Sequence, residues 1–134
     1  MNKENGRLPG HIVLLVEDDE MNRAIASRVM EKWALTVVQV QNGAEAVEEA
    51  ARRRYDLILM DLQMPTMDGY HAARHIRLTQ QHIPIIALTA SAEPEIVDSI
   101  RSAGMNDYVI KPFQPKELFN KIAQHLNEIR TSPA

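Results

Sequence analysis

Five short apolar runs are spaced along the chain, and a stretch with helical spacing follows each of them. The runs cover residues 11–16, 36–40, 57–60, 84–88 and 108–110. Short apolar runs bounded by turn residues are typical of strands, and a run without alternation indicates a strand buried on both faces. The third run is the clearest, because Leu57, Ile58, Leu59 and Met60 are all apolar and the run stops at a carboxylate, Asp61.

Between these runs, apolar residues recur at intervals of three and four, the spacing of a helix with one buried face. Helices are predicted after residue 20, after residue 42, over residues 69–79, around residues 96–103 and over residues 118–129. The first helix is expected to direct one apolar face toward the core, formed by Met21, Ala24, Ile25, Val29, Met30 and Trp33. The third is expected to bury Ala72, Ala73 and Ile76.

Strand and helix therefore alternate five times, in a (βα)5 pattern. This alternation predicts right-handed crossovers and a five-stranded parallel sheet with helices on both faces, the doubly wound α/β class. The carboxyl ends of parallel strands meet at one edge of the sheet, and ligands bind there. The predicted fold therefore brings residues that are far apart in the sequence to a single edge.

Composition adds limits to this picture. The chain has 134 residues, 45% of them hydrophobic, which suits one globular domain. Residues 1–10 and 131–134 are polar and are expected to be tails or linkers, which leaves residues 11–130 as the domain. A net charge of −3 gives no reason to expect direct nucleic-acid contact. No apolar stretch approaches membrane-spanning length, and no membrane contact by this domain is expected. The chain contains no Cys, which excludes disulfides and suits the cytoplasmic location that we expect.

Polar residues suited to binding a metal or a phosphoryl group follow four of the five predicted strands. They are Glu17 and Asp18 after the first strand, Asp61 after the third, Thr89 after the fourth and Lys111 after the fifth. Three carboxylates brought together repel one another, and a divalent cation relieves that repulsion. Hard oxygen ligands, with no Cys and no well-placed His, favour Mg²⁺ over zinc.

The same set of residues suits phosphoryl transfer. Mg²⁺ keeps coordination positions open for phosphate oxygens. The Thr89 hydroxyl and the Lys111 ammonium are both suited to the oxygens of a phosphoryl group. A carboxylate nucleophile such as Asp61, placed beside these groups, has what the formation of an aspartyl phosphate requires.

Four motifs, each after a predicted strand, resemble those of the response-regulator receiver domain of two-component signalling. The motifs span residues 16–19, 60–69, 87–90 and 108–113. The resemblance covers roughly residues 11–128 and implies a flavodoxin-like fold with strand order 2-1-3-4-5. The segments 16–22 and 85–90 are most similar to receivers of hybrid histidine kinases. The sequence leaves open whether this domain stands alone or was cut from such a kinase.

By this resemblance, Asp61 is the phosphoacceptor, and it takes a phosphoryl group from a histidine kinase or a histidine phosphotransfer protein. Asp18 and Asp61 are expected to bind Mg²⁺ directly. The backbone carbonyl of Gln63 is expected to join them, and Glu17 to act through water. These roles would make the domain a phosphorelay component.

The resemblance also assigns roles at the ends of the last two strands. Thr89 is expected to hydrogen-bond the bound phosphoryl group, and Lys111 to pair with it. The Lys111-Pro112 peptide bond is expected to be cis. Tyr108 is expected to change rotamer as Thr89 moves. These residues would convert phosphorylation into a change of shape.

The expected function is thus a signalling switch and not an enzyme with a separate substrate, although the domain would catalyse its own phosphorylation and dephosphorylation. Its output is expected at the face formed by the fourth helix, the fifth strand and the fifth helix. A homodimer formed through the fourth and fifth helices on phosphorylation is a further hypothesis.

Two other functions fit an α/β sheet less well. An aspartate-nucleophile phosphatase needs an aspartate two positions after the nucleophile as acid and base, and this chain has Gln63 there. A nucleotide- or flavin-binding module needs glycine and amide donors in its first loop, and that loop is acidic over residues 17–20.

The histidines do not suggest a second metal site. His71 and His75 have helical metal-ligand spacing but lack a third ligand, so a solvated face is expected. His11, His82 and His125 are expected at the surface or at the ends of elements.

Overall fold

The computed structural model describes residues 6–64 and 67–131, and its strands match the apolar runs of the sequence. The strands are β1 (Ile12–Val16), β2 (Thr36–Val40), β3 (Leu57–Asp61), β4 (Ile85–Thr89) and β5 (Asp107–Ile110). All four strand pairs are parallel, and the order across the sheet is β2-β1-β3-β4-β5. The predicted doubly wound, flavodoxin-like fold with order 2-1-3-4-5 is therefore confirmed.

One helix follows each strand. The helices are α1 (Glu20–Glu31), α2 (Gly43–Arg52), α3 (Gly69–Arg77), α4 (Pro94–Ser102) and α5 (Pro115–Thr131). The first three begin at side-chain caps, because Asp19, Asn42 and Asp68 each accept a hydrogen bond from the backbone N–H three residues further on. These caps fix where each loop at the carboxyl edge of the sheet ends.

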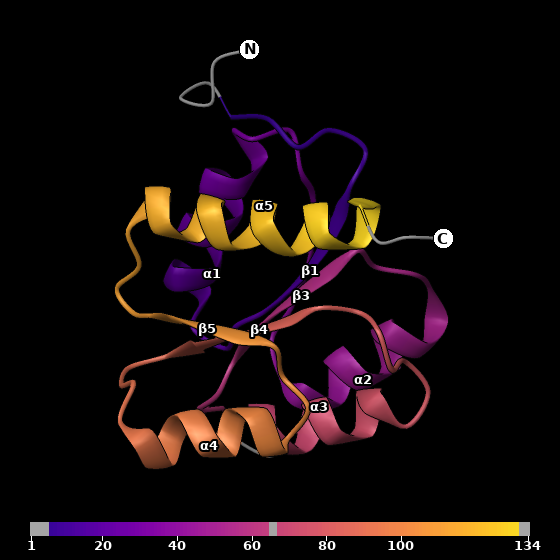
Figure 1. Cartoon of the computed structure of the whole chain (residues 1–134), viewed down its shortest axis with the longest axis vertical. Coiled ribbons are helices and arrows are strands. Elements are labelled where there is room, and N and C mark those ends of the chain that lie inside the picture. The colour runs from indigo at the N-terminus through magenta and orange to yellow at the C-terminus, as the bar shows by residue number, and fades with distance from the viewer. Residues whose placement is uncertain (1–5, 65–66, 132–134) are drawn as a thin grey trace.

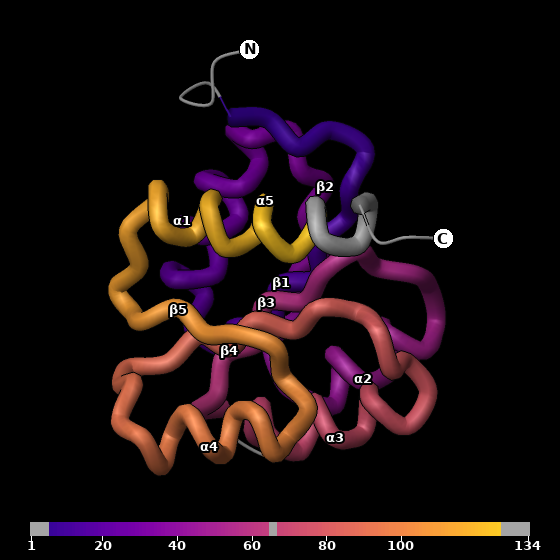
Figure 2. Tube along the Cα trace, viewed as in Figure 1, coloured from indigo at the N-terminus to yellow at the C-terminus, as the bar shows by residue number. Residues whose placement is uncertain are grey.

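The sheet lies between two layers of helices, with α1 and α5 on one side and α2, α3 and α4 on the other (Figure 1). Alternate residues of one strand therefore enter different cores. Leu15 and Leu59 pack with the α1–α5 side, whereas Leu14 and Met60 pack with the other. Figure 2 traces the same path, with the strands between the two helical layers. Every residue of β3 and β4 is buried, as the unbroken apolar runs predict.

The predicted inward face of the first helix is wrong in part. Met21 is 71% exposed and Ile25 is 51% exposed, while Ala26, Ser27 and Met30 are buried. The small residues lie against the sheet, and Ser27 is buried at little cost because it accepts a hydrogen bond from the side-chain amide of Gln39. Two large apolar side chains are thereby left on the surface of α1.

Part of the expected N-terminal tail packs on the domain. The backbone N–H of Leu8 donates to the carbonyl of Trp33 at 2.6 Å, and Leu8 packs against the core beside α1 and α5. Trp33 in turn meets Phe119 edge to face, with ring centroids 5.1 Å apart. Of the predicted tails, residues 1–5 and 132–134 lie outside the described residues, as does Pro65, and Thr131 is the last residue of α5. Within the described part of the chain, no helix has the length and apolar character needed to span a membrane.

Candidate functional site

The carboxyl edge of the sheet holds a cleft of about 280 Å³ at the ends of β1, β3, β4 and β5. Its lining includes six of the residues singled out in the sequence: Glu17, Asp18, Asp61, Gln63, Thr89 and Lys111. They come from four separate segments, and the parallel sheet brings them together because β1 and β4 both flank β3. The cleft is thus a direct consequence of the strand order.

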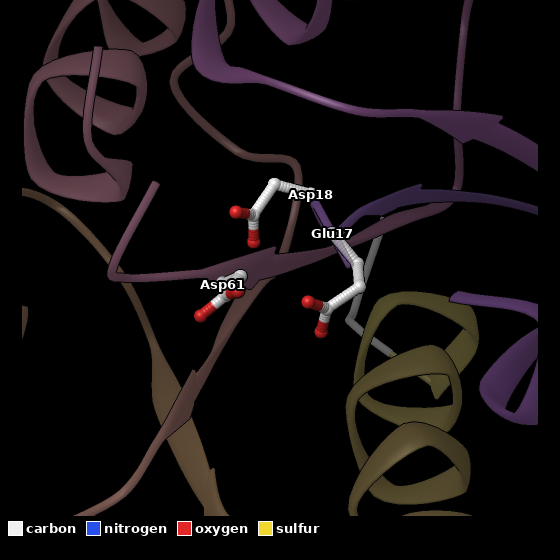
Figure 3. A group of neighbouring side chains, drawn as sticks. All are labelled: Glu17, Asp18 and Asp61. Atoms are coloured by element: carbon white, nitrogen blue, oxygen red, sulfur yellow. The ribbon is translucent and has the colours of Figure 1, made fainter. Parts of the chain in front are cut away.

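Three carboxylates form the floor and rim of this cleft. One carboxylate oxygen from each of Glu17, Asp18 and Asp61 lies within 4.8 Å of the others. Glu17 and Asp61 are only 2% and 3% exposed, whereas Asp18 is open to solvent. Figure 3 shows the three side chains converging at the ends of β1 and β3. This spacing suits a hard divalent cation such as Mg²⁺, which is bound by carboxylate oxygens and keeps some of its waters.

The charges in the cleft do not balance. The Nζ of Lys111 lies 3.4 Å from a carboxylate oxygen of Glu17 and 3.4 Å from one of Asp61. Burial, together with the nearby Asp61 charge, raises the pKa of Glu17 to about 7. Burial alone would lower the pKa of Lys111, but the Asp61 and Glu17 carboxylates outweigh it and raise that pKa. One ammonium is therefore insufficient for three carboxylates, and a cation would complete the set.

The loop after β3 contacts both the carboxylate and the main-chain carbonyl of Asp61. The backbone N–H of Gln63 donates to Oδ1 of Asp61 at 3.3 Å, and that of Gly69 donates to the carbonyl of Leu62 at 3.1 Å. A Cβ on Gly69 would lie 2.4 Å from the carbonyl oxygen of Asp61, so only glycine allows this approach. The loop thus turns back onto the strand end and leaves the Asp61 carboxylate facing the cleft.

Thr89 and Lys111 lie on neighbouring strand ends. The Lys111 backbone N–H donates to the carbonyl of Thr89 at 2.8 Å, and the Lys111-Pro112 peptide bond is cis. The Thr89 hydroxyl donates to the carbonyl of Ser91 at 2.9 Å and accepts from its N–H. The hydroxyl is therefore held by its own loop, at the rim of the cleft, and not by the carboxylates.

Tyr108 lies away from the cleft lining, half-buried against the core on the α4 side of the sheet. The Nζ of Lys121 lies 5.1 Å from the centre of its ring. Lys121 also donates to Asp107 at 2.7 Å, and Nε2 of His125 lies 2.9 Å from the second oxygen of Asp107. The expectation of a surface position for His125 is wrong, because it is 8% exposed and lies in the middle of α5.

Among the lining residues to which sequence reasoning gave no role in the cleft are Asn22, Tyr70 and Ile96. All three lie in the first turn of α1, α3 or α4, which starts at the same edge as the strand ends. The signal was available, since a helix that follows a strand-end loop begins near the edge where the strand ends.

The strand order and the acidic cleft define a flavodoxin-like α/β domain with a carboxylate cluster ready for a metal. The chain belongs to the response regulator receiver domain family, whose family model matches residues 13–123. The family inferred from the four sequence motifs is therefore confirmed.

Individual relatives carry the same domain in much longer chains. This chain is 35% identical over 119 residues to the transcription factor SKN7 of Saccharomyces cerevisiae, covering 89% of this chain and 19% of that protein. It is 40% identical over 111 residues to the autoinducer 2 sensor kinase/phosphatase LuxQ of Vibrio vulnificus, covering 82% and 13%. The chain thus spans less than a fifth of the length of these relatives.

Solved structures agree with the fold. The receiver domain of the sensor histidine kinase PA1611 from Pseudomonas aeruginosa, solved with a magnesium ion in its active-site cleft, is 40% identical, with a TM-score of 0.83 over 88% of this chain and 98% of that one. The chemotaxis protein CheY4 of Vibrio cholerae is 28% identical, with a TM-score of 0.82 over 85% and 97%.

Proposed function

We propose that this domain is the phosphoacceptor of a two-component or phosphorelay pathway, and that Asp61 carries the phosphoryl group. The observation that supports this most directly is the position of the Asp61 carboxylate, buried at the end of β3, 3.4 Å from Lys111 and inside the carboxylate cluster. Family membership and the relatives among sensor kinases support the same role.

In the proposed reaction, an oxygen of Asp61 attacks the phosphorus of a phosphohistidine on a histidine kinase or phosphotransfer protein. The P–N bond breaks, its electron pair goes to the imidazole, and the imidazole takes up a proton from solvent. An acyl phosphate forms on Asp61. Later attack by water on phosphorus returns the free carboxylate and inorganic phosphate, so the domain resets itself.

Mg²⁺, when bound, would neutralise charge on the transferring phosphoryl oxygens. Asp18 and Asp61 would hold it directly, with the carbonyl of Gln63, and Glu17 would act through water. The magnesium in the related PA1611 receiver supports this assignment. The cluster of three carboxylates, with oxygens within 4.8 Å, supports it in this chain.

Thr89 and Lys111 would hold the phosphoryl group once it is on Asp61. Lys111 already lies 3.4 Å from Asp61, so its ammonium can pair with a phosphoryl oxygen after a small movement. Thr89 must give up its hydrogen bond to Ser91 to donate to the same group. That exchange would move the loop after β4 and start the switch.

The switch would reach the α4–β5–α5 face through Tyr108. Its ring packs with the core on the α4 side and contacts Lys121 of α5, so a change in its rotamer alters both helices. A population shift between two arrangements of this face would carry the output, including homodimer formation through α4 and α5.

The protein donor would approach over α1. An apolar groove of about 460 Å³ includes Ile25 and Val29 and shares Glu17, Asn22, Leu88 and Lys111 with the cleft. Ile25, which lines this groove, and Met21, one turn before it on α1, are both exposed and would offer apolar contacts to a donor. A donor helix seated there would place its phosphohistidine at the mouth of the cleft.

Residues 11–130 would form the complete receiver unit, joined in the cytoplasm to other domains such as the kinase core of a hybrid histidine kinase. The coverage of the relatives supports this, since the chain matches only 13% of the length of LuxQ and 19% of that of SKN7. Gln63 argues against a general phosphatase, because an amide cannot protonate a leaving alcohol.

The test is incubation with acetyl phosphate and Mg²⁺, followed by intact mass measurement. One phosphoryl increment is expected for the wild type and none without Mg²⁺. Retention of the increment in Asp61→Asn would overturn the assignment. Hydrolysis of an ordinary phosphomonoester would instead favour the phosphatase.

A further inference from the structure

Asp18 is the one member of the carboxylate cluster that is open to solvent. Within the described part of the chain, no hydrogen bond or ion pair holds its carboxylate. Glu17 and Asp61, by contrast, are buried and contact Lys111. The direction of the Asp18 side chain therefore depends on the backbone of the loop between β1 and α1.

That backbone is held on both sides of Asp18 by one residue of α1. The Nη1 of Arg23 donates to the main-chain carbonyl of Glu17 at 2.9 Å. The backbone N–H of Arg23 donates to the carbonyl of Asp19 at 2.9 Å, as the first turn of the helix requires. Arg23 thus joins the residue before Asp18 to the residue after it.

Other bonds complete the frame but do not replace Arg23. The backbone N–H of Glu17 donates to the carbonyl of Val40, and the N–H of Asp19 donates to the Glu17 carboxylate, both at 3.2 Å. Neither of these bonds reaches the Glu17 carbonyl, where the chain leaves β1. The guanidinium supplies that bond, and its planar group is suited to a fixed geometry.

We propose that Arg23 is a positioning residue for the metal site: its guanidinium fixes the Glu17–Asp19 turn so that Asp18 faces the cation. The inference rests on the magnesium site in the proposed function. Groups that orient metal ligands commonly change metal affinity by tenfold or more when they are removed. Arg23 would act in this way through the backbone and would not touch the metal.

Because Arg23 is charged, the direction in which its substitution changes Mg²⁺ affinity tests the proposal. An arginine near three carboxylates repels a cation, so removing its charge alone would strengthen Mg²⁺ binding. Removing the hydrogen bond that fixes the turn would weaken binding. Arg23→Gln removes both, and the direction of the change shows which effect is larger.

The experiment is calorimetric titration of the full chain with MgCl₂ at pH 8.5, where Glu17 is ionised. We expect Arg23→Gln to bind Mg²⁺ about tenfold more weakly than the wild type. Arg28→Gln is the matched control, because Arg28 is an exposed arginine in the last turn of the same helix, and we expect it to bind like the wild type. Equal or tighter binding by Arg23→Gln would overturn the proposal.

Arg23→Lys gives a second test, which remains available where Arg23→Gln does not fold by circular dichroism. Lysine keeps the charge but not the planar guanidinium, so positioning predicts weaker binding than the wild type, and a role of charge alone predicts unchanged binding. Phosphorylation from acetyl phosphate adds a kinetic readout. We expect Arg23→Lys to raise the Mg²⁺ concentration for half-maximal rate and to leave the rate at saturating Mg²⁺ unchanged.

The failure of this proposal differs from the failure of the proposed function. A wild type that binds no Mg²⁺ would count against the magnesium site itself. A wild type that binds Mg²⁺ with the same affinity as Arg23→Lys and Arg23→Gln would count against Arg23 alone.

Discussion

Two clusters of acidic and basic side chains lie on this domain, and they are built in opposite ways. In the cleft, three carboxylates lie close together, and the ammonium of Lys111 pairs with only two of them, those of Glu17 and Asp61. On the α5 side of β5, the single carboxylate of Asp107 accepts from Lys121, from His125 and from the N–H of Tyr108. The first cluster has fewer positive charges than carboxylates, whereas in the second both carboxylate oxygens of Asp107 accept hydrogen bonds.

The pKa shifts of Glu17 and Asp107 go in opposite directions, although burial acts on both carboxyl groups in the same sense. Burial and the Asp61 charge raise the pKa of Glu17. Burial also acts to raise the pKa of Asp107, but hydrogen bonds from Lys121 and His125 outweigh it and lower that pKa. A buried carboxylate with enough cationic donors stabilises the fold. A buried carboxylate without them can instead bind a ligand such as a cation.

The largest effect is expected from removing the only ammonium that pairs with the carboxylates in the described cleft. Lys111→Gln should slow phosphorylation from acetyl phosphate by about a hundredfold, because a preorganised donor to the phosphoryl oxygens is lost. Stopped-flow or quenched mass measurement gives the rate. Lys121→Gln is the control from the satisfied cluster, and a similar loss of rate there would break the comparison.

The next largest effect is expected on the free energy of unfolding, which should respond differently to a substitution in each cluster. Asp107→Asn should lower the free energy of unfolding by about 2 kcal/mol, since it weakens charged hydrogen bonds from Lys121 and His125. Asp61→Asn should leave it unchanged or raise it, since it removes repulsion between carboxylates. Urea denaturation without Mg²⁺ measures both, and equal losses in the two variants would contradict the distinction.

The raised pKa of Glu17 has a signed consequence for stability. Because this pKa is about 7 in the folded domain and 4.5 without structure, its contribution to stability is present below pH 4.5 and is lost as the pH rises toward 7. The free energy of unfolding is measured against pH for the wild type and for Glu17→Gln. The difference between the two curves isolates the contribution of Glu17 from that of other groups. Saturating Mg²⁺ should abolish this loss of stability with rising pH. If the Glu17 contribution instead rose with pH in the metal-free protein, the pKa of Glu17 would be lowered by folding and not raised.

Mg²⁺ binding should displace the proton that the raised pKa leaves on the Glu17 carboxyl group. At pH 6, most Glu17 is protonated, so binding should release a proton and be about tenfold weaker than at pH 8. Titrations in buffers of different ionisation enthalpy count the proton. The absence of release would mean that Glu17 is already charged without the metal.

The smallest expected effect tests access to the cleft and not its chemistry. Ile25→Glu should reduce transfer from a phosphorylated histidine phosphotransfer protein by about tenfold and leave phosphorylation by acetyl phosphate unchanged. Leu78→Glu, at the end of α3 and 77% exposed, is the matched control on a surface away from the groove. Equal loss with both donors would place Ile25 in the reaction itself.

The strands and the site were accessible from the sequence because both depend on local signals. Unbroken apolar runs such as Leu57–Met60 are typical of buried strands, and a parallel sheet then brings Asp61, Thr89 and Lys111 to one edge. The positions of these residues followed from order along the chain, without knowledge of any distance.

Features that depend on contacts between elements were not accessible. Apolar spacing placed Ile25 in the core, but the small residues Ala26 and Ser27 pack more closely on the sheet. His125 looks like a surface residue until Asp107, 18 positions earlier, is found beside it. The bond from Arg23 to the carbonyl of Glu17 has no signature in residue spacing either.

The central claim is that Asp61 carries the phosphoryl group, and chemical trapping tests it at the level of a single residue. Borohydride reduces an acyl phosphate to the alcohol, which converts a phosphorylated aspartate into homoserine. After phosphorylation with acetyl phosphate and Mg²⁺, reduction and digestion, peptide mass spectrometry should find homoserine at position 61 and aspartate at position 18. Homoserine at position 18 alone, or at neither position in a protein that gained the phosphoryl mass, would contradict the claim.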